Sequence, residues 1–169
     1  TTLVMGGPGC GKTVFALQSL VNAVRLEPAI FVAFEESSVQ IMANAATFGW
    51  DLPGLIAEKL FFLDARLSPD SIQAGDFDLT GMLSMLSAKA DEMGAQRIVF
   101  DGIDVLLTLL DDPEAERREI YRIRDWLAET GMTGIITQKA GDPEADRRYS
   151  FLQFMVDCVV VLRQQLING

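Results

Sequence analysis

The sequence has 169 residues, of which 49% are hydrophobic, so the chain can bury one sizeable core, and we expect a single domain over residues 1–169. Basic residues number 14 against 24 acidic ones, and the net charge of −10 argues against binding nucleic acid through a standing positive surface. Histidine is absent, and two cysteines, Cys10 and Cys158, are too few for a disulfide framework or a zinc-site spacing.

The composition also indicates where the protein is located and which residues could carry out a reaction. No stretch reaches the about 18 uninterrupted apolar residues of a membrane span, and no basic region precedes an apolar one at the start of the sequence. With so few cysteines, a cytoplasmic location without membrane contact is expected. Since histidine is lacking, we expect carboxylates, lysine and bound magnesium to carry out any reaction.

The first predicted elements are a strand, a glycine-rich loop and a helix. Apolar residues 3–5 precede the sequence GGPGCGKT at residues 6–13, which fits the phosphate-loop pattern GxxxxGK(S/T), and an amphipathic segment follows. The glycines let several backbone N–H groups point at one anion, and the positive end of a helix that begins near Lys12 adds to the attraction. Lys12 would reach the β- and γ-phosphates and the Thr13 hydroxyl a magnesium ion; the alternative is a turn without a ligand. The residues expected to hold the nucleotide are Gly7, Pro8, Gly9, Cys10, Gly11, Lys12, Thr13 and Val14.

Further apolar runs predict strands at residues 30–34, 60–63, 98–100, 134–136 and 159–162, and their lack of polar alternation is typical of strands covered on both faces. Helical patterns at residues 79–93 and 120–127 stop at Gly94 and Gly131. Another helix begins at Ser37 or Ser38, and residues 48–53 close it in a turn. This alternation predicts an α/β fold with a mostly parallel, twisted sheet and helices on both faces. Charged stretches at residues 111–114 and 141–148 are predicted to be mobile loops.

Two glutamates follow the strand at residues 30–34. Glu35 and Glu36 would lie at the carboxyl edge of the sheet, where the phosphate loop also emerges. One of them could orient and deprotonate a water that attacks a γ-phosphate, and we predict a catalytic role for the pair. The alternative is that they only complement the dipole of the following helix.

Polar residues end two later strands at the same edge. Asp101 closes the run Arg97-Ile98-Val99-Phe100-Asp101, which fits the Walker B pattern, and is predicted to hold magnesium, through water, together with Thr13. Without the phosphate loop, an aspartate there would be read as a turn former. The stretch Thr137-Gln138-Lys139 could sense the γ-phosphate or form a solvated turn, and the sequence leaves both interpretations open.

Together these stretches resemble the KaiC family of circadian-clock ATPases, within the RecA-like superfamily, and above all its N-terminal ATPase domain. The resemblance covers nearly the whole chain. It implies a RecA-like P-loop NTPase core, magnesium-dependent and slow ATP hydrolysis, and ATP bound between the subunits of a homo-hexameric ring. It also implies Glu35, Glu36 and Lys12 as catalytic residues and Thr13 as the magnesium-side hydroxyl. The segments that carry it are the phosphate loop, residues 34–36, 48–52 and 76–79, the Walker B strand and residues 157–163.

The sequence also departs from the family. The family usually has an acidic residue followed by arginine where Gln138 and Lys139 stand, and we expect the domain to be incomplete at both ends. Residues 151–157 contain no hydroxyl, whereas the second KaiC domain has adjacent Ser and Thr acceptors there, so self-phosphorylation of this domain is not expected. Clock or signalling proteins are the expected further partners. The alternatives are a RecA/RadA-type DNA-binding recombinase and an ATP-binding regulatory module with little turnover.

Overall fold

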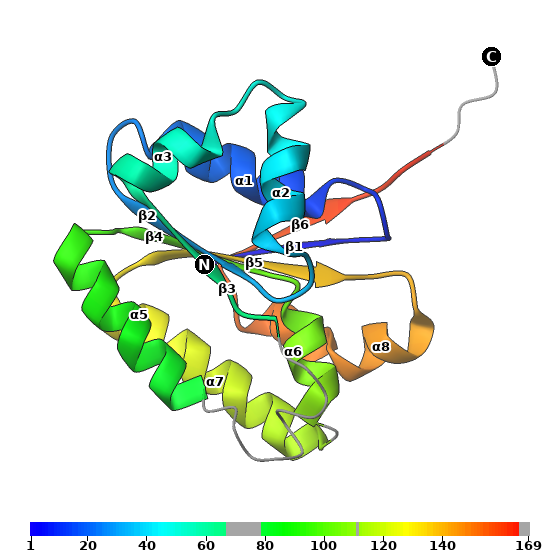
Figure 1. The fold of residues 1–169 in the computed structure, drawn as a ribbon. Helices are drawn as coiled ribbons and strands as arrows, with labels where there is room; N and C mark the ends of the chain where they lie inside the picture. The colour runs from blue at the N-terminus through cyan, green and yellow to red at the C-terminus, as the bar shows by residue number, and fades with distance from the viewer. Residues whose placement is uncertain (67–78, 111, 166–169) are drawn as a thin grey trace.

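The computed structural model describes residues 1–66, 79–110 and 112–165. Within these ranges the chain folds around one six-stranded sheet (Figure 1). The strand order is β3-β2-β4-β5-β1-β6, and all paired neighbours run parallel, which confirms the predicted α/β class. The strands are β1 (Thr2–Gly6), β2 (Ala29–Ala33), β3 (Leu60–Asp64), β4 (Arg97–Asp101), β5 (Thr133–Lys139) and β6 (Cys158–Leu162).

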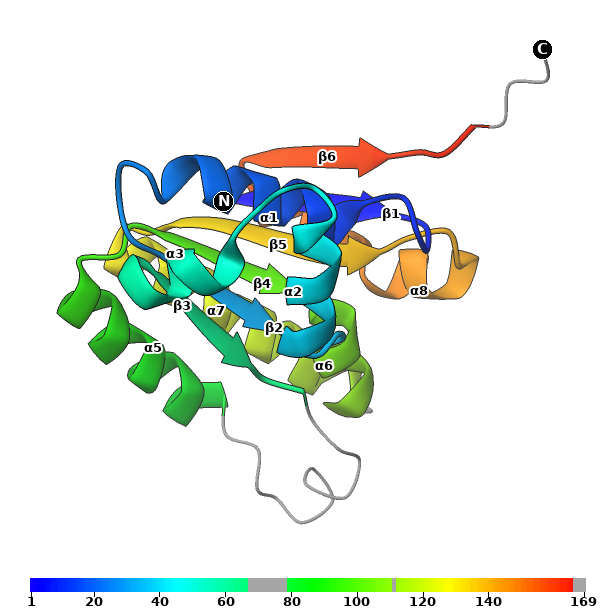
Figure 2. The same ribbon diagram turned by 45° about the horizontal axis from the view of Figure 1, so that its top comes forward.

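Helices cover both faces of the sheet, as predicted (Figures 1 and 2). One face carries α1 (Lys12–Ala23), α2 (Ser38–Ala46) and α3 (Leu52–Glu58). The other carries α5 (Leu79–Met93), α6 (Ile103–Leu110) and α7 (Pro113–Thr130), with α8 (Pro143–Arg148) and the 3-10 helix η1 (Ser150–Phe154) beyond them. Within the described ranges, no helix combines the length and the apolar character needed to cross a membrane.

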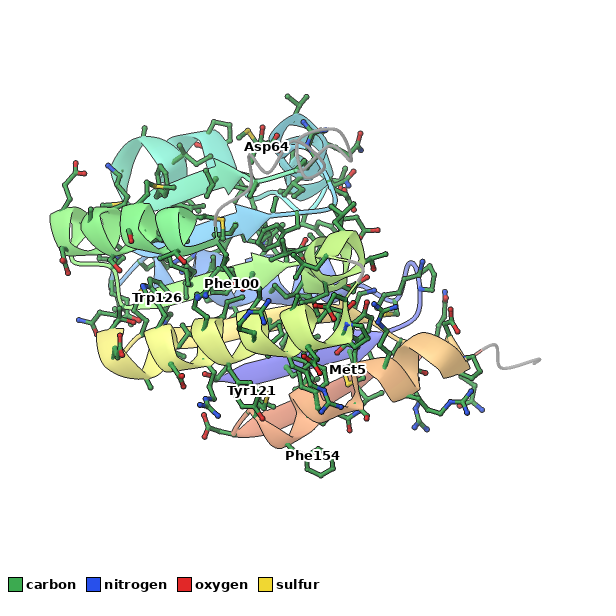
Figure 3. All side chains as sticks on the ribbon, turned by 90° about the horizontal axis from the view of Figure 1, so that it is seen from below. Met5, Asp64, Phe100, Tyr121, Trp126 and Phe154 are labelled. Carbon is green, nitrogen blue, oxygen red and sulfur yellow. The ribbon has the colours of Figure 1, made fainter. Side chains whose placement is uncertain are left out.

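Successive side chains of the central strands point to opposite faces of the sheet, so the core has two layers. On β2, Phe31 packs with the α1 side of the sheet, and Ile30 and Val32 pack with the α5–α7 side. In the second layer Phe100 of β4 meets Trp126 of α7 edge to face, with ring centroids 6.2 Å apart (Figure 3). Strands with both faces covered therefore consist of nearly continuous apolar runs, as the sequence predicted.

Strand β6 is an exception to this burial. It pairs only with β1 at the edge of the sheet, and Val159 and Val161 remain 39% and 51% exposed. The expectation that this apolar run is covered on both faces was therefore wrong. An edge position depends on the strand order, which the sequence of a single strand does not specify.

Most predicted helix ends are confirmed. Ser37 caps α2, and its Oγ accepts a hydrogen bond from the backbone N–H of Gln40 at 3.2 Å. Gly94 and Gly131 follow α5 and α7 with positive φ angles of 68° and 67°. The turn predicted at residues 48–53 instead contains the start of α3, where the side chain of Asp51 accepts a hydrogen bond from Gly54 N–H.

The two charged stretches were predicted to be loops, but both contribute to helices. Asp112 is the N-cap of α7 and Pro113 its first residue, while Asp111 lies outside the described residues. Residues 143–148 form α8, which also begins with a proline. Arg148 at its end pairs with Glu116 of α7, whose side chain is 1% exposed, and this contact holds α8 against the body of the domain.

Candidate functional site

The glycine-rich loop joins the carboxyl end of β1 to the first turn of α1. Helix α1 begins at Lys12, as predicted, and Gly11 is its N-cap with φ 91°, a left-handed conformation that glycine adopts without steric cost. The buried residues Ala16, Leu17 and Leu20 fix the helix on the sheet. Its free N–H groups and its positive dipole end therefore point into the loop, where an anion would bind.

Lys12 is held inside this loop by backbone carbonyls. Its Nζ donates hydrogen bonds to the carbonyl oxygens of Gly6 and Gly7, each at 3.1 Å. The ammonium group is thus already positioned at the mouth of the loop, where phosphate oxygens would meet it.

Asp101 connects the loop to the end of β4 and the end of β5. Its Oδ2 accepts a hydrogen bond from Thr13 Oγ1 at 2.9 Å, and its Oδ1 accepts one from Thr137 Oγ1 at 2.7 Å. Thr137 Oγ1 in turn accepts from the backbone N–H of Gly102 at 2.8 Å. The structure thus brings together Thr13 and Asp101, the two residues predicted to bind magnesium.

Burial raises the pKa of the Asp101 carboxyl above its ordinary value. The hydrogen bonds from Thr137 and Thr13 oppose this rise in pKa, and the negative charges of Glu35 and Glu36 add to it. A cation bound next to Asp101 would favour the ionised carboxylate, so the site is chemically suited to a metal ion. Within the described residues no group of three or more His, Cys, Asp or Glu side chains gathers around a metal position. Thr13 and Asp101 together offer one hydroxyl and one carboxylate, which fits Mg²⁺, because this ion commonly uses one or two carboxylates with water and phosphate oxygens.

Glu35 and Glu36 follow β2 and line the same pocket, but they have different neighbours. Glu36 Oε2 accepts a hydrogen bond from Asn44 Nδ2 of α2 at 3.4 Å. The side chain of Glu35 lies against Gly102, where an added Cβ would be 3.0 Å from that of Glu35, and Gly102 has a positive φ of 78°. Glycine at position 102 therefore permits the close approach of Glu35 to the residue that follows Asp101.

The three polar residues at the end of β5 do not act together. Thr137 and Lys139 line the pocket, whereas Gln138 projects to the opposite face, as the period of a strand requires. Gln138 is fully buried, and neither its Nε2 nor its Oε1 has a hydrogen-bond partner within the described part of the chain. Two of the three candidates for sensing a phosphate thus reach the site.

These residues surround a pocket of about 280 Å³. Its lining is polar at the loop and the glutamates and apolar at Phe48 and Trp50, whose rings stack with centroids 5.1 Å apart. From the sequence, Phe48 and Trp50 indicated only a turn and a family resemblance, and neither they nor Asn44 were predicted to line the pocket. The pocket is lined by Pro8, Gly9, Gly11, Lys12, Thr13, Val14, Leu17, Glu35, Glu36, Ile41, Asn44, Ala45, Phe48, Trp50, Thr137 and Lys139.

Two predicted loop residues lie on the other side of the loop. Gly7 and Cys10 line a separate hollow of about 570 Å³ next to Leu162 at the end of β6. The Cys10 sulfur occupies the space beside Gly6, since a Cβ added at Gly6 would lie 2.3 Å from it. Only the backbone of Cys10 could therefore take part in holding phosphates.

Comparison with known proteins matches the whole chain to one protein family. The family model "ATPase: KaiC" matches residues 1–169. Circadian clock oscillator proteins KaiC from Prochlorococcus marinus subsp. pastoris and Thermosynechococcus vestitus are 42% and 40% identical over 98% of this chain. The circadian clock protein KaiC2 of Synechocystis sp. is 36% identical over 99% of it. The matched part is the N-terminal domain of these longer proteins, and the chain spans about a third of their length. Of the stretches that carried the resemblance, residues 76–78 lie outside the described residues.

Proposed function

Because the chain belongs to the KaiC family of ATPases, we propose that it binds ATP with magnesium and hydrolyses it slowly, in signalling or circadian-type timing. Its six-stranded parallel sheet is consistent with a RecA-like P-loop ATPase core. The observation that carries the proposal is the convergence of the phosphate loop, the Thr13–Asp101 contact and two glutamates on one pocket.

The pocket suggests how the nucleotide is oriented. Phosphates would lie at the N-terminus of α1 with Lys12 at the β- and γ-phosphates. Thr13 and, through water, Asp101 would hold the magnesium ion, which neutralises charge on the phosphates when bound. The stacked rings of Phe48 and Trp50 provide an apolar surface in the same pocket, which suits a purine base.

The two glutamates are proposed to handle the attacking water. A carboxylate of Glu35 or Glu36 accepts a proton from the water while the water oxygen bonds to the γ-phosphorus. The bond between that phosphorus and the β–γ bridging oxygen breaks, which leaves ADP and inorganic phosphate. Glu35 lies against Gly102, the residue that follows the carboxylate proposed to hold magnesium, so we assign it the larger share of catalysis.

Assembly is a further part of the proposal. We expect the full-length protein to form ATP-dependent homo-hexameric rings through a head-to-tail interface, with nucleotide between subunits, and to act with clock or signalling proteins. The support is the family and the names of the relatives, which are circadian clock proteins. Light scattering that gives a monomer with saturating ATP and magnesium would count against the ring.

The test of function uses the full-length protein and measures both nucleotide affinity and phosphate release. Lys12→Ala is expected to lose most ATP affinity, because it removes the cation that the loop holds at the phosphates. Glu35→Gln and Glu36→Gln should keep ATP affinity and lower turnover, with the larger loss for Glu35→Gln, because an amide cannot take up the proton of the water. Tight ATP binding without phosphate release from the wild type would instead identify a regulatory ATP-binding module.

A further inference from the structure

Lys139 is a second cation in the pocket that the hydrolysis scheme above does not use. It is the last residue of β5, two positions beyond Thr137, so both project from the same face of the strand. This is the face that carries α1, and Lys139 lines the pocket with Lys12, Glu35 and Glu36.

The backbone of Lys139 is fixed, whereas its side chain is exposed. Its N–H donates to Asp104 Oδ1 at 3.0 Å, and the next residue, Ala140, donates from its N–H to the Gly6 carbonyl oxygen at 2.9 Å. Lys139 is also the register partner of Gly6 in the β1–β5 ladder. Its side chain thus starts one strand spacing, about 5 Å, from the residue whose carbonyl holds Lys12 Nζ.

Lys139 balances the negative charge of the other residues that line the pocket. The lining contains two lysines and two glutamates, and the buried Asp101 lies directly behind it. No ion pair of the Lys139 ammonium occurs within residues 1–66, 79–110 and 112–165. Without Lys139 the lining would carry a net negative charge toward an incoming triphosphate, which would weaken the binding of its terminal phosphate.

We propose that Lys139 is a catalytic residue that contacts an oxygen of the ATP γ-phosphate, as a cation supplied by the same chain. The inference rests on the proposed ATPase function. Lys139 forms no covalent bond and transfers no proton: its ammonium group donates a hydrogen bond to the phosphate while water attacks the phosphorus and ADP leaves. Its contact strengthens as negative charge shifts between the phosphate oxygens, so it stabilises the transition state and also distinguishes ATP from ADP.

The test compares Lys139→Met, which keeps the length of the side chain and removes its charge, with Lys139→Arg in the full-length protein. Calorimetry with magnesium measures the affinities for ADP and for the non-hydrolysable β,γ-imido analogue of ATP. For Lys139→Met we expect a loss of analogue affinity of about ten-fold and a change in ADP affinity below about two-fold. Phosphate release at saturating ATP should fall by about ten- to a hundred-fold. Lys139→Arg keeps the positive charge, so it should retain part of the analogue affinity and part of the turnover.

Lys59→Met is the matched control, because it removes the same charge from the C-cap of α3, outside the residues that line the pocket. Equal losses of affinity for ADP and the analogue, or wild-type values for both, would overturn the role of Lys139. Lys12→Ala gives the background signal of any other nucleotide site. A wild type that binds nucleotide no better than Lys12→Ala would refute the ATPase proposal itself, whereas normal wild-type turnover with an unchanged Lys139→Met variant would refute only this inference.

Discussion

Thr13 and Asp101 are 88 positions apart in the sequence, yet Thr13 Oγ1 lies 2.9 Å from Asp101 Oδ2. Asp101 also bonds Thr137, so one buried carboxyl joins the first turn of α1 to the ends of β4 and β5. The geometry of this edge of the pocket therefore depends on the Asp101 carboxyl, which the first two predictions concern.

The first prediction is a pH-dependent stability that Asp101→Asn removes. The pKa of this carboxyl is raised above 3.8 in the folded protein, whereas the unfolded chain titrates near 3.8. Between the two values only the folded state holds the proton, so the contribution of Asp101 to the free energy of unfolding decreases as pH rises through this window. Urea unfolding without magnesium, from about pH 4 to about pH 7, should show a greater loss of stability for the wild type than for Asp101→Asn. Asp91→Asn, at an exposed position, should behave like the wild type; parallel curves for wild type and Asp101→Asn would contradict the assignment.

A second prediction concerns Thr137→Val, which keeps the shape of the side chain but removes its hydroxyl. The change leaves the Gly102 N–H without its acceptor and removes a hydrogen bond to Asp101, so the free energy of unfolding should fall by about 1–3 kcal/mol. Chemical denaturation measures the difference. Thr133→Val, at an exposed position of the same strand, serves as the control, and equal stabilities of the two variants would show that the hydroxyl is dispensable.

A third prediction is that Gln138→Met stabilises the protein, whereas Thr137→Val destabilises it. A fully buried amide with no partner among the described residues is costly, and a methionine of similar volume removes that cost. The free energy of unfolding should rise by about 1–3 kcal/mol, while Gln153→Met, at an exposed position of η1, should change it by less than about 0.5 kcal/mol. A destabilised Gln138→Met variant would mean that the amide has a partner in solution, such as a buried water.

A fourth prediction is that the domain does not phosphorylate itself. The segment from Phe151 to Asp157 that leads into β6 contains no hydroxyl, and in-line transfer requires an acceptor oxygen about 3 Å from phosphorus. Ser150 is the nearest hydroxyl, but its Oγ already donates a hydrogen bond to the Arg147 carbonyl oxygen at 2.9 Å. Mass spectrometry after long incubation of the full-length protein with ATP and magnesium should find no stoichiometric phosphate here. Phosphate on any residue from Ser150 to Asp157 would disprove the prediction, and Ser150→Ala would locate it.

The sequence predicted the features that depend on local pattern. The phosphate loop, the six strands and the stops at Gly94 and Gly131 each rest on a few neighbouring residues, and the structure confirms them. The convergence of Thr13, Glu35 and Asp101 was also predictable, because carboxyl ends of parallel strands meet at one edge.

Features that depend on tertiary contacts were not predictable. The Phe48–Trp50 stack belongs to the pocket only because α2 and α3 pack beside α1, and the burial of Gln138 follows from the register of β5. Helix α8 lies in a stretch rich in charge, and its last residue, Arg148, pairs with Glu116 of α7, 32 positions earlier in the sequence. The exposure of β6 follows from a strand order that no single element encodes.

The place of β1 in the sheet affects the order in which the chain can fold during synthesis. Its two neighbours are β5 and β6, the last two of the six described strands along the sequence, whereas β2, β3 and β4 can pair with one another earlier in synthesis. The apolar residues Leu3, Val4 and Met5 must therefore stay unpaired until β5 and β6 have been synthesised, and long-range pairing of this kind is slow. Until then these residues are exposed to aggregation and to chaperones, and the phosphate loop is fixed at the edge of the sheet only after β1 has paired.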